Sequence, residues 1–278
     1  MYSKSLLFLS VLSVNSFAQC DARFANISQN NDDIAVYRQS QSYDSKIEFS
    51  VKAINNDQCQ LKVMVESENH SFFISDNNRF EFFIESSTTN TGSVKQPVFN
   101  IEQLELAVNL TLKSGTFVKA GAYSDMLTFR LLDDKQQELD VQEISVNTLI
   151  EPNVSLSLLG FNSTDHTVQL GELYSGQEYT NLPTLKVVTN SDVQMTIDSQ
   201  NAGFLQNTLY KQQYQIDYQL NVNQTWYELN KTQLLTIKSS VSSADVFLPL
   251  KVLVKDISKR PAGSYEDTIR ISISPLHY

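Results

Sequence analysis

The sequence has few of the residues from which metal centres and nucleophilic active sites are built. Its 278 residues include two cysteines and three histidines, and the histidines, at positions 70, 166 and 277, are scattered. A protein-bound metal needs three or four ligands close together, and this spacing supplies no ligand cluster. No motif of a serine–histidine–aspartate site or of paired catalytic carboxylates stands out. We therefore expect no enzyme activity, no metal site and no cofactor.

Long apolar runs are also missing after the N-terminus. Residues 1–18 have the order of a secretory signal: the basic Lys4, the apolar run Ser5–Val14, and small residues at Ser16 and Ala18, the positions that signal peptidase reads. We predict a signal peptide cleaved after Ala18. No later stretch is apolar and long enough for a transmembrane helix. The mature chain is therefore expected to be exported and not membrane-spanning.

The two cysteines, Cys20 and Cys59, both lie in the mature chain. In an oxidising compartment such a pair usually forms one disulfide, which closes a long loop and constrains the unfolded chain. One alternative is lipidation of Cys20, but Gln19 is bulky where a lipoprotein signal needs a small residue. The other alternative is a metal site, which the scattered histidines do not support. We predict the disulfide.

Basic residues are fewer than acidic ones, with 21 Lys and Arg against 31 Asp and Glu, a formal net charge of −10. This balance argues against nucleic acid or an anionic membrane surface as a partner. Alanine is sparse, whereas Ser, Thr, Asn, Gln and β-branched residues are common, a composition that suits strands with polar turns. The length after the signal peptide is enough for two domains.

Apolar and polar residues alternate along short segments in both halves of the chain, so each segment can turn one face toward a core. Turn residues separate the segments at intervals typical of β-sandwiches. The clearest segments are Ile47–Val51, Leu61–Val65, Leu106–Leu112, Leu127–Leu131, Val193–Ile197, Leu248–Val254 and Ile269–Ile273. No helical pattern competes with them, and we predict an all-β fold.

The two halves also match each other. Leu61–Phe73 aligns with Val193–Leu205 at a constant offset of 132, and Leu106–Lys113 aligns with Leu248–Lys255 at an offset of 142. Self-similarity over such lengths indicates a duplicated unit. We therefore predict two tandem β-sandwich domains of one fold.

A short motif sharpens this prediction. Ala120–Asp125 and Ala262–Asp267 share the pattern Ala-Gly-x-Tyr-x-Asp at the offset of 142, and an alternating strand follows each time. Chance similarity between polar strands does not account for that match. We place the domains at residues 19–150 and 151–278, with the boundary near Glu151 and Pro152.

The motif has a structural interpretation. Glycine allows a turn conformation closed to other residues, and a tyrosine at the start of a strand can bury its ring and bond its hydroxyl to nearby backbone. We predict that the motif fixes a corner of each sandwich and has no catalytic role. The corner residues are Gly121, Tyr123, Asp125, Gly263, Tyr265 and Asp267.

The C-terminal half resembles a known family. Pro261–Asp267 with the strand Thr268–Ser274 is similar to the closing segment of spore coat protein U-type domains, the subunit domains of archaic, Csu-type chaperone–usher pili. Leu170–Leu173 and Ser199–Leu205 are also similar to pilin-like patterns. The resemblance implies immunoglobulin-like sandwiches that lack their last strand, into which the next subunit inserts an N-terminal extension by β-strand addition.

Both halves can be compared with that scheme. The second domain ends at Tyr278, shortly after Ile273, and is expected to lack its final strand, whereas the first has Leu139–Ile150, with a bulge expected between Val141 and Ile144. The expected acceptor groove of the second domain is lined by Leu156, Leu158, Ile269, Ile271 and Ile273.

The expected mature N-terminus leaves only Gln19 before Cys20, so we expect a subunit that accepts a strand but donates none. Within this family, that position implies a two-domain tip adhesin with the binding domain outermost, active in attachment and biofilm formation. The implied partners are a periplasmic chaperone, the outer-membrane usher and the next pilus subunit. The implied location is the pilus tip, at the surface of a Gram-negative cell.

Three connections of the first domain are candidates for adhesion, because binding residues tend to lie on loops of a rigid fold. By strand alternation, Asn55–Gln58, Ser86–Pro97 and Asp133–Gln136 are expected to share the end away from the second domain. The candidate residues are Thr89, Asn90, Thr91, Val94, Asp133 and Lys135. The alternative is a merely solvated connection. The target stays open between a sugar, a protein and an abiotic surface.

Rival functions follow from the same features. A periplasmic assembly chaperone also has two immunoglobulin-like domains, but usually both are complete and basic residues hold the subunit. An exported coat or matrix protein that self-associates fits the sequence as well. The acidic balance and the expected missing strand favour the pilus subunit over the chaperone.

Overall fold

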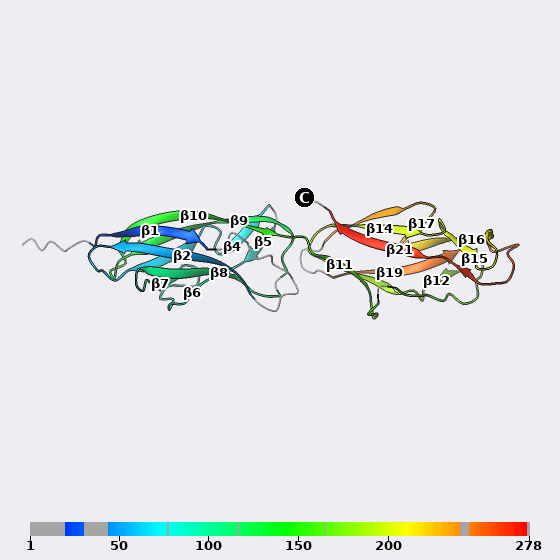
Figure 1. Ribbon diagram of the computed structural model, residues 1–278, viewed down its shortest axis with the longest axis horizontal. Helices are drawn as coiled ribbons and strands as arrows, with labels where there is room; N and C mark the ends of the chain where they lie inside the picture. Colours follow the sequence, from blue (N-terminus) through cyan, green and yellow to red (C-terminus); the bar gives the residue numbers. More distant parts are fainter. Residues whose placement is uncertain are drawn as a thin grey trace, which may run out of the picture.

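The computed structural model describes residues 20–30, 44–76, 78–115, 117–163, 165–239 and 245–276. The predicted signal peptide lies outside these residues. Every regular element that they form is a β-strand, and the strands build two bodies that lie end to end (Figure 1). We call residues 20–150 the N-terminal sandwich and residues 151–276 the C-terminal sandwich. In this part of the chain, no helix that could cross a membrane is found.

The N-terminal sandwich has two sheets. One has the strand order β1-β2-β8-β6, and the other has the order β5-β4-β9-β3-β7 with β10 on the free edge of β9. The strands are β1 (Ala22–Gln29), β2 (Ser45–Asn55), β3 (Lys62–Ser67), β4 (Phe72–Ser75), β5 (Asn78–Glu81), β6 (Phe83–Ser86), β7 (Val98–Asn100), β8 (Glu105–Leu112), β9 (Gly121–Leu132) and β10 (Glu138–Ile150). This order corresponds to the two sheets of an immunoglobulin-like sandwich.

Alternation explains why these segments form strands. In β2, Ile47, Phe49, Val51 and Ala53 are buried, and the residues between them are more exposed. Successive side chains of a strand point to opposite faces, so this pattern turns one face inward. Phe49 meets Phe129 of the facing sheet, with ring centroids 5.8 Å apart. The predicted sandwich core is therefore present.

The C-terminal sandwich repeats the plan. One sheet has the order β11-β13-β19-β16-β15-β20, with β12 on β19 and β17 on β16, and the other has the order β18-β14-β21. The strands are β11 (Val154–Leu158), β12 (Glu178–Tyr179), β13 (Thr184–Thr189), β14 (Val193–Ser199), β15 (Phe204–Asn207), β16 (Lys211–Val222), β17 (Thr225–Glu228), β18 (Gln233–Ile237), β19 (Asp245–Val254), β20 (Tyr265–Glu266) and β21 (Ile269–Pro275). Its buried apolar residues form a core cluster separate from that of the N-terminal sandwich.

The pairings show which strands correspond. β3 pairs with β9 as β14 pairs with β21, and β2 lies between β1 and β8 as β13 lies between β11 and β19. The corresponding strands are related by the offsets found in the sequence: 132 between β3 and β14, and 142 between β9 and β21. Among the described residues of the C-terminal sandwich, no strand corresponds to β10. This difference is the main structural contrast between the two bodies.

Asn190 connects the two bodies. Its carbonyl oxygen accepts a hydrogen bond from the N–H of Ala120 at 2.8 Å. Its side-chain oxygen accepts from the N–H of Asn153 at 2.7 Å, and its side-chain nitrogen donates to the carbonyl of Glu151 at 3.1 Å. Asn190 is 3% exposed, so these bonds are shielded from water. The first residue of β9 therefore lies at the junction, and Leu132 lies at the far end.

Candidate functional site

The first candidate site is the open edge of the C-terminal sandwich. β21 pairs with β14 from Ile269 opposite Ser199 to Pro275 opposite Val193. No other strand of the described chain pairs with β21. β11 lies next to β21 but takes its hydrogen bonds from β13 in the other sheet. We use the term open edge for β21 together with the facing side chains of β11.

Burial shows what the open edge lacks. Leu127, Phe129 and Leu131 of β9 are each 0% exposed. The residues 142 positions later, Ile269, Ile271 and Ile273, are only partly buried against their core. The five residues predicted to line the groove, including Leu156 and Leu158, all lie on the two strands of the open edge and pack against the same core. An apolar strip of this kind is left partly in water.

In the N-terminal sandwich, β10 covers the corresponding strip. It pairs with β9 along its whole length, from Glu138 opposite Leu132 to Ile150 opposite Gly121. Val146 is 0% exposed and Ile150 is 1% exposed, so β10 contributes directly to the core. The N-terminal sandwich is thus closed by its own strand.

The register of β10 differs from the sequence prediction. The irregularity lies between Glu138 and Asp140, not between Val141 and Ile144. Val141 and Leu149, although apolar, are 37% and 54% exposed. The phase is set by pairing with β9 rather than by the apolar residues of β10 alone, and this puts Thr148 in the interior.

The predicted corner residues lie together in each sandwich. The hydroxyl of Tyr123 donates to the carbonyl of Lys119 at 2.8 Å, and the hydroxyl of Tyr265 donates to the carbonyl of Pro261 at 2.9 Å. Gly263 has a φ of 157°, and a Cβ there would lie 2.9 Å from the Asn207 amide nitrogen. Glycine is required at that turn because another side chain would meet both strain and a close contact. The geometry is that of a tyrosine corner.

The aspartates of the motif anchor the neighbouring turn. Asp125 is 3% exposed and accepts hydrogen bonds from the Ser67 hydroxyl at 2.6 Å and the Asn69 side-chain amide at 2.9 Å. Asp267 likewise accepts from the hydroxyls of Ser199 and Tyr218, both at 2.5 Å. Burial and the bond to Asp267 raise the pKa of Tyr218 far above its ordinary value. These groups are fully engaged in holding the fold.

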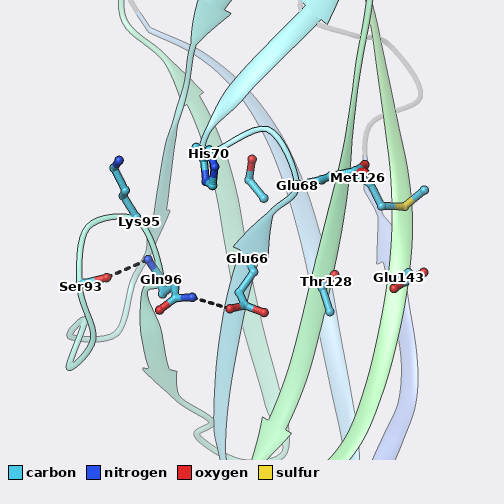
Figure 2. A pocket seen from close by; sticks show the side chains of 10 residues that line it. Glu66, Glu68, His70, Ser93, Lys95, Gln96, Met126, Thr128 and Glu143 are labelled. Carbon is cyan, nitrogen blue, oxygen red and sulfur yellow. Dashed lines mark hydrogen bonds between the residues drawn. The ribbon is translucent and has the colours of Figure 1, made fainter.

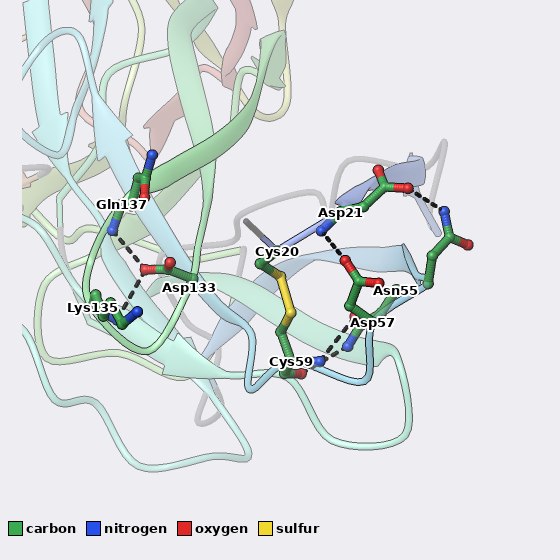
Figure 3. The surroundings of a disulfide bond; sticks show 9 residues. Cys20, Asp21, Asn55, Asp57, Cys59, Asp133, Lys135 and Gln137 are labelled. Atoms are coloured by element: carbon green, nitrogen blue, oxygen red, sulfur yellow. Dashed lines mark hydrogen bonds between the residues drawn. A yellow bond between two sulfur atoms is a disulfide. The ribbon is translucent and has the colours of Figure 1, made fainter. Parts of the chain in front are cut away.

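The end of the N-terminal sandwich away from the junction carries the disulfide (Figure 3). Cys20 and Cys59 are bonded, with their Cα atoms 6.2 Å apart. Asn55 braces the turn, because its side chain donates to the carbonyl of Cys59 at 2.7 Å and accepts from its N–H at 3.1 Å. Asp57 accepts from the N–H of Asp21 at 2.7 Å. This end is therefore a braced surface.

Asp133, predicted as an adhesive residue at the same end, is buried at 6% exposure. Its carboxylate accepts hydrogen bonds from the N–H groups of Lys135 at 2.9 Å and Gln137 at 2.8 Å (Figure 3). The expectation of a surface role for Asp133 is corrected, because the carboxylate shapes the turn. Lys135 is exposed beside it.

The connection Ser86–Pro97 is placed differently from the prediction. Asn90 bridges to Phe99 and Thr91 donates to the carbonyl of Val98, which makes a hairpin whose tip runs along β3. Gln96 donates to the Glu66 carboxylate at 2.6 Å. The expectation that this segment shares the end of Asp133 is wrong, because pairing of β7 with β3 turns the tip back toward the middle of the sheet. Thr89, Asn90, Thr91 and Val94 are exposed on this hairpin.

Beside the hairpin is a second candidate site, an open cleft with a volume of about 780 Å³ (Figure 2). Its floor is a row across three strands, since Glu66 pairs with Thr128 and Thr128 pairs with Glu143. Ser93 and Lys95 of the hairpin form one wall. Arg130 and Gln96 both bond to Glu66, which fixes the carboxylate. The cleft offers polar and charged groups of both signs.

The sequence did not reveal this cleft, because its floor depends on register. Glu66, Thr128 and Glu143 are far apart in the chain, and each is an ordinary outward-facing residue of its strand. Outward polar positions are the rule in a sandwich sheet. The only sequence signal is the length of the connection before β7, and it does not say which way the hairpin turns.

No protein-family model and no curated protein matches the chain. Solved structures that it resembles include a chain of the complex of the CsuC chaperone with the CsuE tip adhesion subunit of archaic Csu pili from Acinetobacter baumannii, with 11% identity, a TM-score of 0.41 and coverage of 90% of this chain and 91% of that chain. The CupB6 tip adhesin from Pseudomonas aeruginosa has 8% identity, a TM-score of 0.44 and coverage of 91% and 94%.

CfaE, the adhesive subunit of the CFA/I fimbria of enterotoxigenic Escherichia coli, has 12% identity, a TM-score of 0.41 and coverage of 93% and 79%. The solved structures similar to this chain thus include tip and adhesive subunits of chaperone–usher pili and fimbriae. Likeness at these identities and TM-scores carries no functional conclusion. The function proposed below therefore rests on the residues of this chain.

Proposed function

We propose that this chain is the tip adhesin of a chaperone–usher pilus and mediates attachment and biofilm formation. The next subunit inserts a strand along the open edge of the C-terminal sandwich and anchors the chain in the fibre. Before assembly, a periplasmic chaperone covers the same edge, and the outer-membrane usher passes the chain to the cell surface. No catalytic role is part of the proposal.

One observation carries the proposal: among the described residues, the C-terminal sandwich has no counterpart of β10, the strand that closes the N-terminal sandwich. β10 buries Leu127, Phe129 and Leu131 completely, whereas their counterparts on β21, such as Ile271, remain partly in water. Burying apolar surface contributes roughly 25 cal/mol per Å². A strand laid on β21 as β10 lies on β9 would gain this energy and also pair the free backbone groups of β21.

The N-terminal sandwich supports the adhesive half of the proposal. It is complete, so its loops and outer faces are available for a target. The hairpin of Ser86–Pro97 and the cleft beside it gather exposed polar groups on a rigid sheet. Binding residues tend to lie on such connections. We assign the adhesive surface to this sandwich.

A strand-addition experiment tests the anchoring half. The synthetic peptide Glu138–Ile150, which has the sequence of β10, serves as a surrogate donor strand for the full chain. We expect it to raise the unfolding temperature of the C-terminal sandwich, because a ligand that binds only the folded state stabilises it. Differential scanning calorimetry with increasing peptide measures the shift.

Two variants make the experiment specific. Ile271→Asp places a charge in the apolar strip and should abolish the shift, whereas Arg270→Asp changes an outward residue of the same strand and should preserve it. Charges are costly to bury without a partner. A peptide that leaves the native chain unaffected, or that stabilises both variants equally, would contradict the proposal.

A further inference from the structure

The chain contains its own example of a sandwich joined to the body that follows its last strand. β10 runs antiparallel to β9 and ends with Ile150 opposite Gly121, the first residue of β9. The chain then enters the C-terminal sandwich, and Ala120 donates to Asn190 across the junction. The body that follows a completing strand is therefore seated against the corner end of the sandwich that the strand completes.

The same end of the C-terminal sandwich is formed by equivalent residues. Gly263 lies 142 positions after Gly121, and a Cβ on it would approach Asn207, as a Cβ on Gly121 would approach Ser75. Asn207 pairs with Tyr265. The turn between β15 and β16 therefore occupies the place of the turn between β4 and β5, which lies beside the junction. Figure 1 shows β15 and β16 at the end of the molecule opposite the N-terminal sandwich.

The two equivalent turns differ in chemistry. Asp76 is the described residue between β4 and β5, whereas the turn after β15 carries Leu209 and Tyr210, which are 81% and 54% exposed. Leu209 is the most exposed large apolar residue among those described. Contiguous exposed apolar surface marks interaction sites, and Leu209 and Tyr210 are adjacent in this turn.

The turn is also held in shape. Asn207 is 2% exposed, and its side-chain oxygen accepts hydrogen bonds from the N–H groups of Leu209 at 3.0 Å and Tyr210 at 3.1 Å. The ring of Tyr210 packs edge-on against Tyr214, with centroids 5.6 Å apart. Tyrosine is enriched among the residues that carry most of the binding energy of an interface.

We propose that Leu209 and Tyr210 form a docking surface for the folded β-sandwich of the subunit whose strand completes the open edge. This inference rests on the proposed function. A strand that pairs with β21 antiparallel, as β10 pairs with β9, ends beyond Ile269. Its end then lies at the corner that Gly263 and this turn form. The body that follows the strand is then seated against Leu209 and Tyr210. The strand supplies the anchor, and the turn fixes the angle of the joint.

Photo-crosslinking in assembled fibres tests the proposal with the full chain. The probe amino acid p-benzoylphenylalanine is placed at Leu209, or at Ser272, an outward residue of β21 next to the inserted strand, or at Leu234 on β18 as a control that is 61% exposed. Mass spectrometry identifies the crosslinked peptides. We expect the same protein to be crosslinked at Leu209 and at Ser272. Its folded part should be captured at Leu209 and its N-terminal segment at Ser272, whereas the probe at Leu234 should give no crosslink.

The outcomes separate the two proposals. An N-terminal segment captured at Ser272 with no crosslink, or with a different protein, at Leu209 overturns the docking surface and leaves the proposed function standing. No capture at Ser272 overturns both. A strand inserted parallel to β21 would seat its body at the junction end and would also leave Leu209 free of crosslinks.

A pair of substitutions gives a second measurement. Leu209→Asn combined with Tyr210→Asn should speed release of the chain from isolated fibres in mild denaturant by about tenfold or more, since affinity changes of related interfaces appear mainly in dissociation. Binding of the Glu138–Ile150 peptide should be unchanged, because the peptide has no body to dock. Leu234→Asn is the matched control. Unchanged release by the double variant contradicts the docking surface.

Discussion

The two corner aspartates hold the local structure of each sandwich: Asp125 is 3% exposed, and Asp267 is half-buried. Asp267 accepts hydrogen bonds from the hydroxyls of Ser199 and Tyr218 and from the N–H groups of Asn201 and Thr268, at 2.5–3.0 Å. Asp125 has the corresponding place in the N-terminal sandwich. In each sandwich, one carboxylate thus ties two neighbouring strands together at one end. Asp125 links β9 to the turn after β3, and Asp267 links the start of β21 to the turn after β14.

The first prediction concerns this carboxylate. Asp267→Asn replaces one carboxylate oxygen with an NH2 donor that faces hydroxyl or N–H donors, so at least one of the partners loses its bond. Hydrogen bonds to charged groups contribute about 1.5–3 kcal/mol each, and we expect a loss of that order in the free energy of unfolding. Urea denaturation measures it. Glu266→Gln, an exposed neighbour, should change stability little.

The stability of the N-terminal sandwich should also depend on pH through Glu85. The Thr111 hydroxyl, which donates to Glu85 at 2.8 Å, and then Lys113 hold the pKa of Glu85 below its ordinary value. A carboxyl whose folded pKa is depressed adds stability above its unfolded value, about 4.3, and this stability is lost as pH falls through the folded pKa.

Thr111→Val removes the hydroxyl from a site that is 0% exposed. We expect a shallower fall in stability on acidification below about pH 4.3 than in the native chain. Chemical denaturation across that range measures the slope. A slope identical to that of the native chain would show that Thr111 does not set the pKa.

Among the elements, the disulfide and the hairpin of Ser86–Pro97 lie on two different surfaces of the N-terminal sandwich. The disulfide lies at the end away from the junction, and the hairpin lies beside the cleft on β3, β9 and β10. The bond between Cys20 and Cys59 closes a loop with a sequence separation of 39. In the chain-entropy account, such a loop contributes about 4 kcal/mol by restricting the unfolded state. It holds β1 against β2, and β1 is the strand next to β10.

We therefore predict that Cys20→Ala with Cys59→Ala lowers the free energy of unfolding of the N-terminal sandwich by up to about 4 kcal/mol. The transition of the C-terminal sandwich should be unaffected, since its core is separate. Calorimetry of the native and doubly substituted chains resolves the two. Equal destabilisation of both transitions would mean that the two bodies unfold as one.

Shortening Ser87–Lys95 to a tight turn removes one wall of the cleft and leaves β6 and β7 in place. We expect the chain to fold and pili to assemble, with attachment lost. Counting bound cells on a surface, with pili quantified by microscopy, measures this. Full attachment by such pili would show that the adhesive surface does not include this hairpin.

Across the whole molecule, two sandwiches of one fold differ in whether a strand covers the edge of the sheet. The N-terminal sandwich is closed by β10, and β10 leads directly into the second body. In the C-terminal sandwich, no second strand formed by the described residues pairs with β21 at the corresponding place. The chain therefore shows, in its first body, the arrangement that we propose for its second body within a fibre.

Several features were predictable from the sequence because they depend on local spacing. Alternation placed core strands such as β2, β9 and β21, since side chains of a strand point to opposite faces in turn. The matched segments indicated two sandwiches of one plan, and the repeated Ala-Gly-x-Tyr-x-Asp motif placed both corners, because a tyrosine four residues after Lys119 or Pro261 reaches that carbonyl. These are short-range relations, and one sequence contains them.

Other features were decided only in three dimensions. The side of β10 that faces the core follows its pairing with β9, so Thr148 is buried while Leu149 is exposed. The hairpin of Ser86–Pro97 turns toward β3 because of the register of β7.

The register of a strand and the direction in which a connection turns depend on contacts between segments far apart in the chain. The local sequence around a polar residue such as Glu66 or Asp133 does not show whether its side chain lies on the surface or inside. Local spacing along the chain was enough to predict core strands, the duplication and the corners. Which polar groups lie on the surface, which lie inside and where the cleft forms depend on packing, because packing alone establishes which strand lies beside which.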